Sequence, residues 1–323
     1  MQAARQKRSG RSAAAIRRLR LDRLVRRAAT GLWLAFGAYA CWGFLSPVSK
    51  RLLLDFQPMG LNAVRFLIAT IAIVPWLGLR GVSDAIRLLA DRKVLWVNLL
   101  ANASLTLFLY SLVHLRPAFS TLGFYSAPLW TAAFAAAVLK EKVGPWFAPA
   151  VAALLAGGWL ALFGGWRPAA GFSTLGMALA LGSAVLWAWY AVELRKHAAS
   201  YPLKPLMGAS FLFGALYYYA CAVALEGWPR ILHREAATYG WLAVQVVFPT
   251  LLAFILFNAA LQRAPAGQAN ILVAAELGFT IVVSAALFGE RYTMVQLLGL
   301  ALALVAVSGY LWVHQRSAPA SSA

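Results

Sequence analysis

Long apolar runs alternate with short polar breaks along almost the whole chain. The runs cover residues 31–49, 58–79, 95–115, 119–139, 146–164, 174–194, 206–225, 239–261, 268–288 and 294–313. Each is close to 20 residues, which is about the length at which an α-helix crosses the hydrocarbon core of a bilayer. The pattern therefore predicts an all-α polytopic membrane protein with ten transmembrane helices.

The polar breaks limit what lies outside the membrane. The longest covers residues 80–94, which is too short for a folded domain. The sequence also contains no Gly-rich phosphate loop or other ATP-binding motif, and Cys41 and Cys221 both lie inside apolar runs. We therefore expect no enzyme activity, no cofactor, no disulfide framework and no metal cluster.

Composition supports a lipid environment. Hydrophobic residues make up 62% of the chain, charged residues 12%, and the mean hydropathy is +0.71. Soluble domains carry roughly 45–50% apolar and about 25% charged residues. A water-soluble core cannot bury this much apolar surface.

The net charge of +19 is concentrated at the N-terminus, where ten of the 29 Lys and Arg residues precede Thr30. This arm, residues 1–30, has three interpretations: a cytoplasmic anchor that also touches anionic lipid, an organellar transit peptide, or a nucleic-acid-binding tail. We favour the first and expect no nucleic-acid partner. Because Lys and Arg favour cytoplasmic loops, we expect an inner-membrane protein with the N-terminus and the tail, residues 314–323, both cytoplasmic.

The chain contains an internal duplication. A shift of 145 residues aligns the first run with the sixth and pairs Trp42 with Trp187, and a shift of 149 pairs Glu141 with Glu290. Five spans separate the copies, so each enters the membrane from the opposite side. The sequence predicts two inverted five-helix repeats over residues 31–164 and 174–313, an architecture that places a binding site between the halves.

Short motifs recur in order through both repeats. They are Trp42-Gly43 with Pro47 and Lys50, Arg65-Phe66-Leu67, Ser126-Ala127-Pro128-Leu129 leading to Leu139-Lys140-Glu141-Lys142, Ala275-Glu276-Leu277 leading to Leu287-Phe288-Gly289-Glu290-Arg291, and Leu297-Leu298-Gly299. From about residue 31 to 313 the chain resembles the drug/metabolite transporter superfamily, specifically its ten-helix EamA-type exporters. The aromatic content is similar to that of YddG-type amino acid exporters. One departure is Leu277, which stands where the family usually has Pro after this Glu, so we expect the halves to bend differently at the midplane.

Three titratable residues are candidates for chemistry. Glu276 is the only acid well inside a run, where a charge costs roughly 2.5–3.5 kcal/mol on insertion scales. It either binds a substrate amine or carries a coupling proton, or it is a structural carboxylate. Arg65 is either a structural hydrogen-bond hub or a contact for a substrate carboxylate. His114, near the end of the third run, is either an interfacial histidine or part of a proton relay.

Aromatic and amide side chains complete the predicted substrate site. Trp and Tyr rings near mid-span either line a cavity or fill the lipid-facing surface, and an amide in lipid needs a partner on a neighbouring helix or on the substrate. The predicted substrate-binding residues are Trp42, Arg65, Tyr110, Tyr125, Trp130, Trp187, Trp189, Tyr190, Asn258 and Glu276.

These features favour an exporter of small organic solutes, with amino acids as the leading class, working by alternating access as a facilitator or with proton coupling. Two alternatives within the superfamily are a nucleotide-sugar transporter and a drug transporter. A non-transporting receptor or assembly subunit is a third. An intramembrane enzyme would need convergent catalytic groups, which four scattered histidines and one mid-span acid do not supply.

Overall fold

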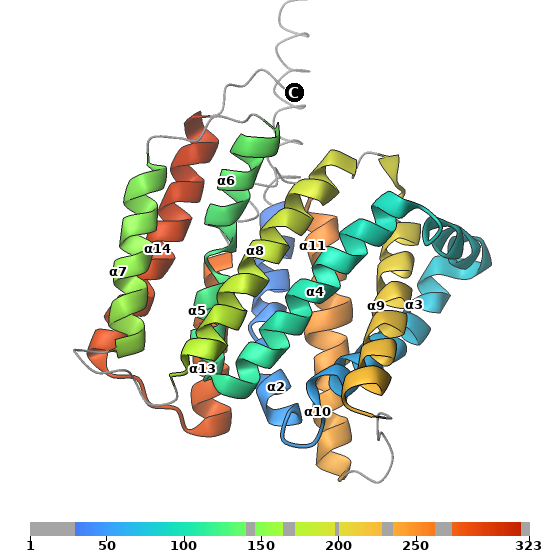
Figure 1. Cartoon of the computed structure of the whole chain (residues 1–323), viewed down its shortest axis with the longest axis horizontal. Helices are drawn as coiled ribbons and strands as arrows, with labels where there is room; N and C mark the ends of the chain where they lie inside the picture. The colour runs from blue at the N-terminus through green and yellow to red at the C-terminus, as the bar shows by residue number, and fades with distance from the viewer. Residues whose placement is uncertain are drawn as a thin grey trace, which may run out of the picture.

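The computed structural model describes residues 30–139, 146–163, 172–197, 200–227, 235–261 and 273–317. Within these ranges the regular structure is entirely helical (Figure 1). A helix over 30–42 is followed by α2 (Leu45–Leu52), α3 (Pro58–Leu88), α4 (Arg92–His114), α5 (Pro117–Phe124), α6 (Ala127–Leu139), α7 (Phe147–Phe163), α8 (Thr174–His197), α9 (Leu203–Leu225), α10 (Ala236–Val246), the π-helix η2 (Val247–Leu252), α11 (Ala253–Leu261), α13 (Val273–Phe288) and α14 (Met294–Ser317).

These helices confirm the predicted membrane fold. Seven helical segments in the described residues are long and apolar enough to span a bilayer, and three shorter apolar helices, Ala148–Ala161, Gly278–Phe288 and Met294–Ala306, match the remaining runs. The predicted break between runs three and four is present, because α4 ends at His114 and α5 begins at Pro117. The predicted break between runs eight and nine lies outside the described residues.

Proline breaks the first span and frees a backbone carbonyl. Pro47 lacks an N–H, so the Gly43 carbonyl has no partner four residues later, and the helix is interrupted at residues 43–44. The Thr280 hydroxyl of α13 donates to this carbonyl at 3.2 Å. A hydrogen bond between the repeats thus replaces one lost within the helix.

The eighth span follows the same logic at Pro249, which lies within η2. Pro249 has no N–H to donate to the Gln245 carbonyl four residues earlier. The Thr250 hydroxyl donates to this carbonyl instead, at 2.8 Å. The π-helix is a local widening of the helix that is frequent at functional sites.

The fourth and ninth spans differ where Pro128 and Leu277 correspond. Residues 125–126 form a turn between α5 and α6, whereas α13 continues without interruption from Val273 to Phe288. The two halves therefore bend differently, as the departure from the family pattern predicts.

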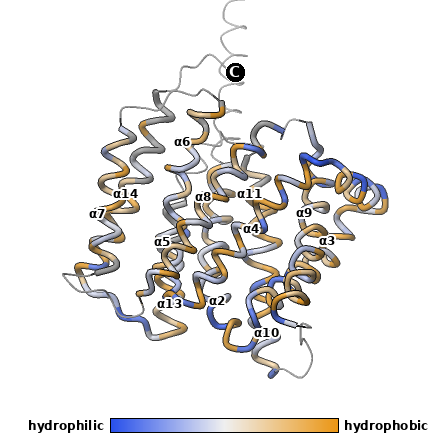
Figure 2. Tube along the Cα trace, in the orientation of Figure 1, coloured by the Kyte–Doolittle hydropathy of each residue, from blue (hydrophilic) through white to orange (hydrophobic). Residues whose placement is uncertain are grey.

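A glycine kink shortens the second span. The backbone of Gly78 has φ 68° and ψ 171°, a conformation that divides α3 and that only glycine adopts readily. The kink thus lies beside residue 79, where the predicted second run ends. The segment beyond it belongs to the hydrophilic region at the upper right of Figure 2.

The main helix pairs join opposite repeats. Helix α3 packs on α9, α4 on α8, and α7 on α14, and Figure 1 shows α7 and α14 side by side at one end of the molecule. Gly157 and Gly299 allow the last pair to meet backbone to backbone: a Cβ on Gly299 would lie 2.7 Å from the Gly157 carbonyl oxygen. The core is therefore largely an interface between the repeats, with a small-residue contact of the kind that membrane helices favour.

Candidate functional site

Glu276 lies where the first span of one repeat meets α13 of the other. Its side chain is 6% exposed, and a Cβ on Gly43 would lie 3.0 Å from the Glu276 carbonyl oxygen and 2.3 Å from the Cβ of Phe279. Only glycine at position 43 permits this crossing. The Trp42-Gly43 motif therefore brings the two backbones together at Glu276.

Aromatic rings surround this crossing. Trp42 contacts Tyr39 at a centroid distance of 5.3 Å and Phe257 of α11 at 5.1 Å, and Phe36 contacts Phe279 at 6.2 Å. Tyr39 lies close enough to Glu276 for an electrostatic interaction. An acid with aromatic rings close by is a combination that can attract an organic cation.

Arg65 lies in a second buried polar group. Arg65 is 1% exposed, and its Nε donates to the Thr250 Oγ1 at 2.6 Å. Next to Thr250 in the chain of hydrogen bonds, Gln245 Nε2 donates to the Ser49 Oγ at 2.6 Å. No hydrogen bond or ion pair joins Arg65 to Glu276 in the described residues.

The repeat equivalent of Trp42 has a similar aromatic environment. Trp187 contacts Phe124 at 5.7 Å and Tyr190 at 4.9 Å. Trp130 and Trp189 both contact Phe134. They are 41% and 43% exposed, so other described residues cover much less of each side chain than they would of a buried one.

The other predicted residues are dispersed. Tyr125 is 2% exposed in an apolar cluster with α7 and α14, and His114 is exposed at the end of α4. The Tyr110 hydroxyl donates to Glu226 at 3.0 Å. The side chain of Asn258 lies outside the described residues. The structure thus brings Trp42 and Glu276 into one region. Trp42 also contacts Phe254 at 5.6 Å, and Phe254 packs on the cluster that contains Phe66, the neighbour of Arg65.

Glu226 is a connecting residue that the sequence interpretation missed. It follows α9, and its carboxylate accepts from the Met59 N–H at 2.9 Å and from the Gly60 N–H at 2.9 Å. It therefore caps α3 of the other repeat, where Pro58 is the first helical residue. The available signal was an acid directly after an apolar run and a Pro at a helix start, but their pairing across 167 residues is not encoded locally.

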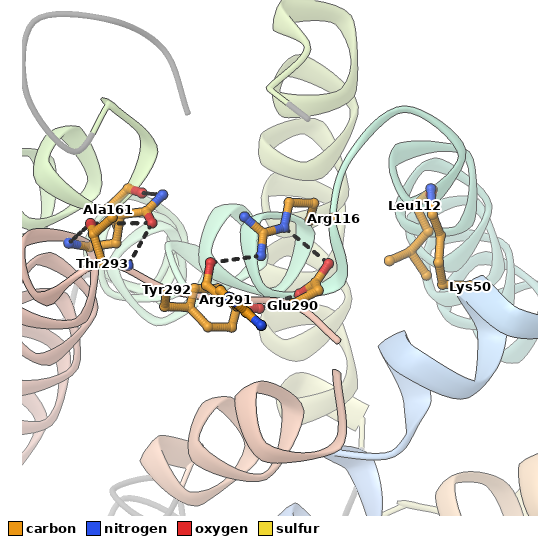
Figure 3. A network of polar contacts seen from close by, with 9 residues as sticks. Lys50, Leu112, Arg116, Ala161, Glu290, Arg291, Tyr292 and Thr293 are labelled. Carbon is orange, nitrogen blue, oxygen red and sulfur yellow. Dashed lines mark hydrogen bonds and ion pairs between the residues drawn. The ribbon is translucent and has the colours of Figure 1, made fainter. Parts of the chain in front are cut away.

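A charged network also joins the two repeats. Arg116 Nε donates to Glu290 at 3.0 Å, and the guanidinium lies 4.7 Å from the Tyr292 ring (Figure 3). The Tyr292 hydroxyl also donates to Glu290, and burial, reinforced by this hydrogen bond, raises the pKa of Tyr292. Nearby, Lys50 donates to the Leu112 carbonyl. Glu290 thus binds a partner in the opposite repeat.

Comparisons with known proteins agree with this architecture. A model of the EamA-like transporter family matches residues 29–163 and 174–312, which correspond to the two repeats. The uncharacterized inner membrane transporter YhbE of Escherichia coli K12 is 27% identical over 311 residues, covering 90% of this chain and 92% of that protein. YhbE of Shigella flexneri has the same identity and coverage.

A solved structure shares the fold. A crystal structure with 18% sequence identity superposes with a TM-score of 0.65 and covers 90% of this chain and 99% of its own.

Proposed function

Because the chain belongs to the EamA-like transporter family, we propose that it exports small organic solutes, with amino acids and related metabolites as the substrate class. The solute passes between the two inverted repeats by alternating access, either down its own gradient or coupled to protons. Both termini face the cytoplasm from the inner membrane. The partners of the protein are the solute and the lipid bilayer.

The observation that carries this proposal is Glu276, a buried acid at a crossing between the repeats. A carboxylate inside a bilayer is unfavourable unless it is paired, neutralised or used. Aromatic rings of Tyr39 and Trp42 lie beside the same crossing. A carboxylate with aromatic neighbours supplies the attraction that an ammonium group needs, and the acid is also suited to carry a proton.

Reconstitution tests the proposal. Purified protein in liposomes of phosphatidylethanolamine and phosphatidylglycerol should take up radiolabelled amino acids with saturable kinetics, whereas protein-free liposomes should not. Uptake should be fastest for apolar and aromatic amino acids. Absence of saturable uptake across amino acids, amines, drugs and nucleotide sugars would contradict a transport function.

The coupling mode is tested separately with Glu276→Gln. If Glu276 carries the proton, this variant should lose the dependence of uptake on a pH gradient while substrate binding stays measurable. Glu235→Gln, at an exposed acid before α10, is the matched control and should keep the dependence. An unchanged pH-gradient dependence in Glu276→Gln would assign the carboxylate another role.

A further inference from the structure

Asn62 and Arg65 form a polar stripe on α3 between two apolar clusters. Phe66 belongs to the cluster shared with α9, and Leu61 belongs to the cluster shared with α2 and α4. Asn62 and Arg65 are three residues apart, so they lie one turn apart on the same helix face. Their exposed fractions are 0% and 1%. We call them the Arg65 stripe.

The stripe meets polar groups of the eighth span. Arg65 Nε donates to Thr250 at 2.6 Å, and the hydroxyl of Thr250 is already committed to the Gln245 carbonyl at 2.8 Å. Gln245 and Thr250 are both 0% exposed. The π-helix at Pro249 therefore turns a hydroxyl toward the guanidinium and fixes the orientation of that guanidinium.

Several polar atoms of this region are buried without a hydrogen-bond partner. They are Asn62 Nδ2, Asn62 Oδ1, Arg65 Nη1 and Gln245 Oε1. Within the described residues no Asp or Glu contacts the guanidinium. Buried polar groups are usually hydrogen-bonded, and buried charges are usually paired. Two N–H donors, one of them cationic, thus lie unused on one helix face.

We infer that the Arg65 stripe binds the carboxylate of the exported solute, with Asn62 as a residue that determines specificity. The guanidinium supplies directional N–H donors that match carboxylate geometry, and the Asn62 amide adds a neutral donor one turn away. A carboxylate would neutralise the charge that no acid in the described residues pairs. This inference rests on the proposed transport function and assigns the chemical group by which the solute is selected.

Binding and transport are measured separately with three probes that share one side chain: L-phenylalanine, its amide and phenethylamine. Binding is read from the melting temperature of the full-length protein in detergent, because a ligand of the folded state raises it. L-phenylalanine should stabilise the wild-type protein at concentrations at least about tenfold lower than the other two, since a charge-assisted hydrogen bond is present only with the acid. Inorganic phosphate should compete only weakly with L-phenylalanine for binding to the Arg65 stripe.

Asn62→Leu is the decisive variant, because it removes two unpartnered polar atoms and is expected to fold. This variant should bind L-phenylalanine about tenfold more weakly than the wild-type protein does. Its binding of phenethylamine should be unchanged. Asn98→Leu is the matched control: Asn98 is 2% exposed, and its amide donates to the Val94 carbonyl of its own helix at 3.0 Å. Arg65→Lys, which keeps the charge but loses the fork, should reduce the preference for the acid further.

The outcomes separate the two proposals. Three results would each overturn the carboxylate site while leaving transport intact. They are equal stabilisation by L-phenylalanine and its amide, tighter binding of phosphate than of L-phenylalanine, and an unchanged preference of Asn62→Leu for L-phenylalanine over its amide. Absence of saturable uptake of these probes and of the wider panel of amino acids, amines, drugs and nucleotide sugars would contradict the transport function, whatever the binding result. Selective loss of acid binding and acid transport in Asn62→Leu supports both.

Discussion

Gly157 and Gly158 provide a test of how α7 packs on α14. The two glycines are neighbours in one helix, yet their surroundings differ. A Cβ on Gly157 would lie 2.6 Å from the Ala303 amide nitrogen and 2.7 Å from the Gly299 carbonyl oxygen, whereas a Cβ on Gly158 would have no atom within 4 Å. Alanine at position 157 therefore requires the helices to separate by roughly 1 Å to restore van der Waals distance.

The magnitude follows from comparing the two alanine variants. Both Gly157→Ala and Gly158→Ala gain about 0.5–1 kcal/mol of helix propensity, so this contribution cancels in the difference between them. The overpacked variant additionally loses about 1–3 kcal/mol, because its obstacles are backbone atoms that cannot rotate away. Gly157→Ala should therefore be about 1–3 kcal/mol less stable than Gly158→Ala.

Thermal unfolding of the purified variants in one detergent, followed by tryptophan fluorescence, measures this difference. Gly157→Ala should melt several degrees below Gly158→Ala, since about 2–4 °C correspond to 1 kcal/mol in chains of 150–250 residues. Gly299→Ala should resemble Gly157→Ala, because its Cβ would lie 2.4 Å from the Ala161 amide nitrogen. Equal melting temperatures for Gly157→Ala and Gly158→Ala would refute the backbone contact between α7 and α14.

Three further predictions concern contacts between the repeats. Glu226→Gln should lower stability by about 1–3 kcal/mol, measured as a lower melting temperature, because it removes the negative charge from the start of α3; an unchanged value would contradict the cap. Glu290→Gln should destabilise by a similar amount, and a double-mutant cycle with Arg116→Gln should give a favourable coupling energy, whereas additive effects would show no interaction. The Tyr201 hydroxyl, which donates to Asp91 at 2.5 Å, holds the pKa of that carboxyl below its usual value, so the stability from this contact should be present at neutral pH and lost as pH falls below about 4. The melting temperatures of wild type and Tyr201→Phe should accordingly converge on acidification, and a constant difference would contradict the assignment.

The features that the sequence predicts well are those that depend on lipid and on local backbone chemistry. Helix positions follow from apolar length because the bilayer offers no partners for exposed backbone groups. The interruptions near Pro47 and Pro128 follow because proline removes a donor and obstructs the preceding turn. Both effects act within a few residues and can be read directly from the chain.

The pairings across the repeats are not predictable in this way. Glu290 is followed directly by Arg291, yet its ion pair is with Arg116, 174 residues away. Gly157 and Gly158 look identical in sequence and differ only through the helix that one of them touches. Asn62 is not among the residues that the sequence analysis singles out. An amide inside an apolar run is a usable signal, but the stripe with Arg65 became apparent only from the burial of both residues.

The contacts between the repeats differ in how readily they can separate. Carboxylates make three of these contacts: Asp55 accepts from Thr238 at 2.7 Å, Glu226 caps α3, and Glu290 pairs with Arg116. These groups are only partly buried, so water can replace their partners at modest cost. At the Gly157–Gly299 contact the two helix backbones touch each other, and water cannot replace that packing. We therefore expect the carboxylate contacts between the repeats to separate more readily than the backbone contact between α7 and α14.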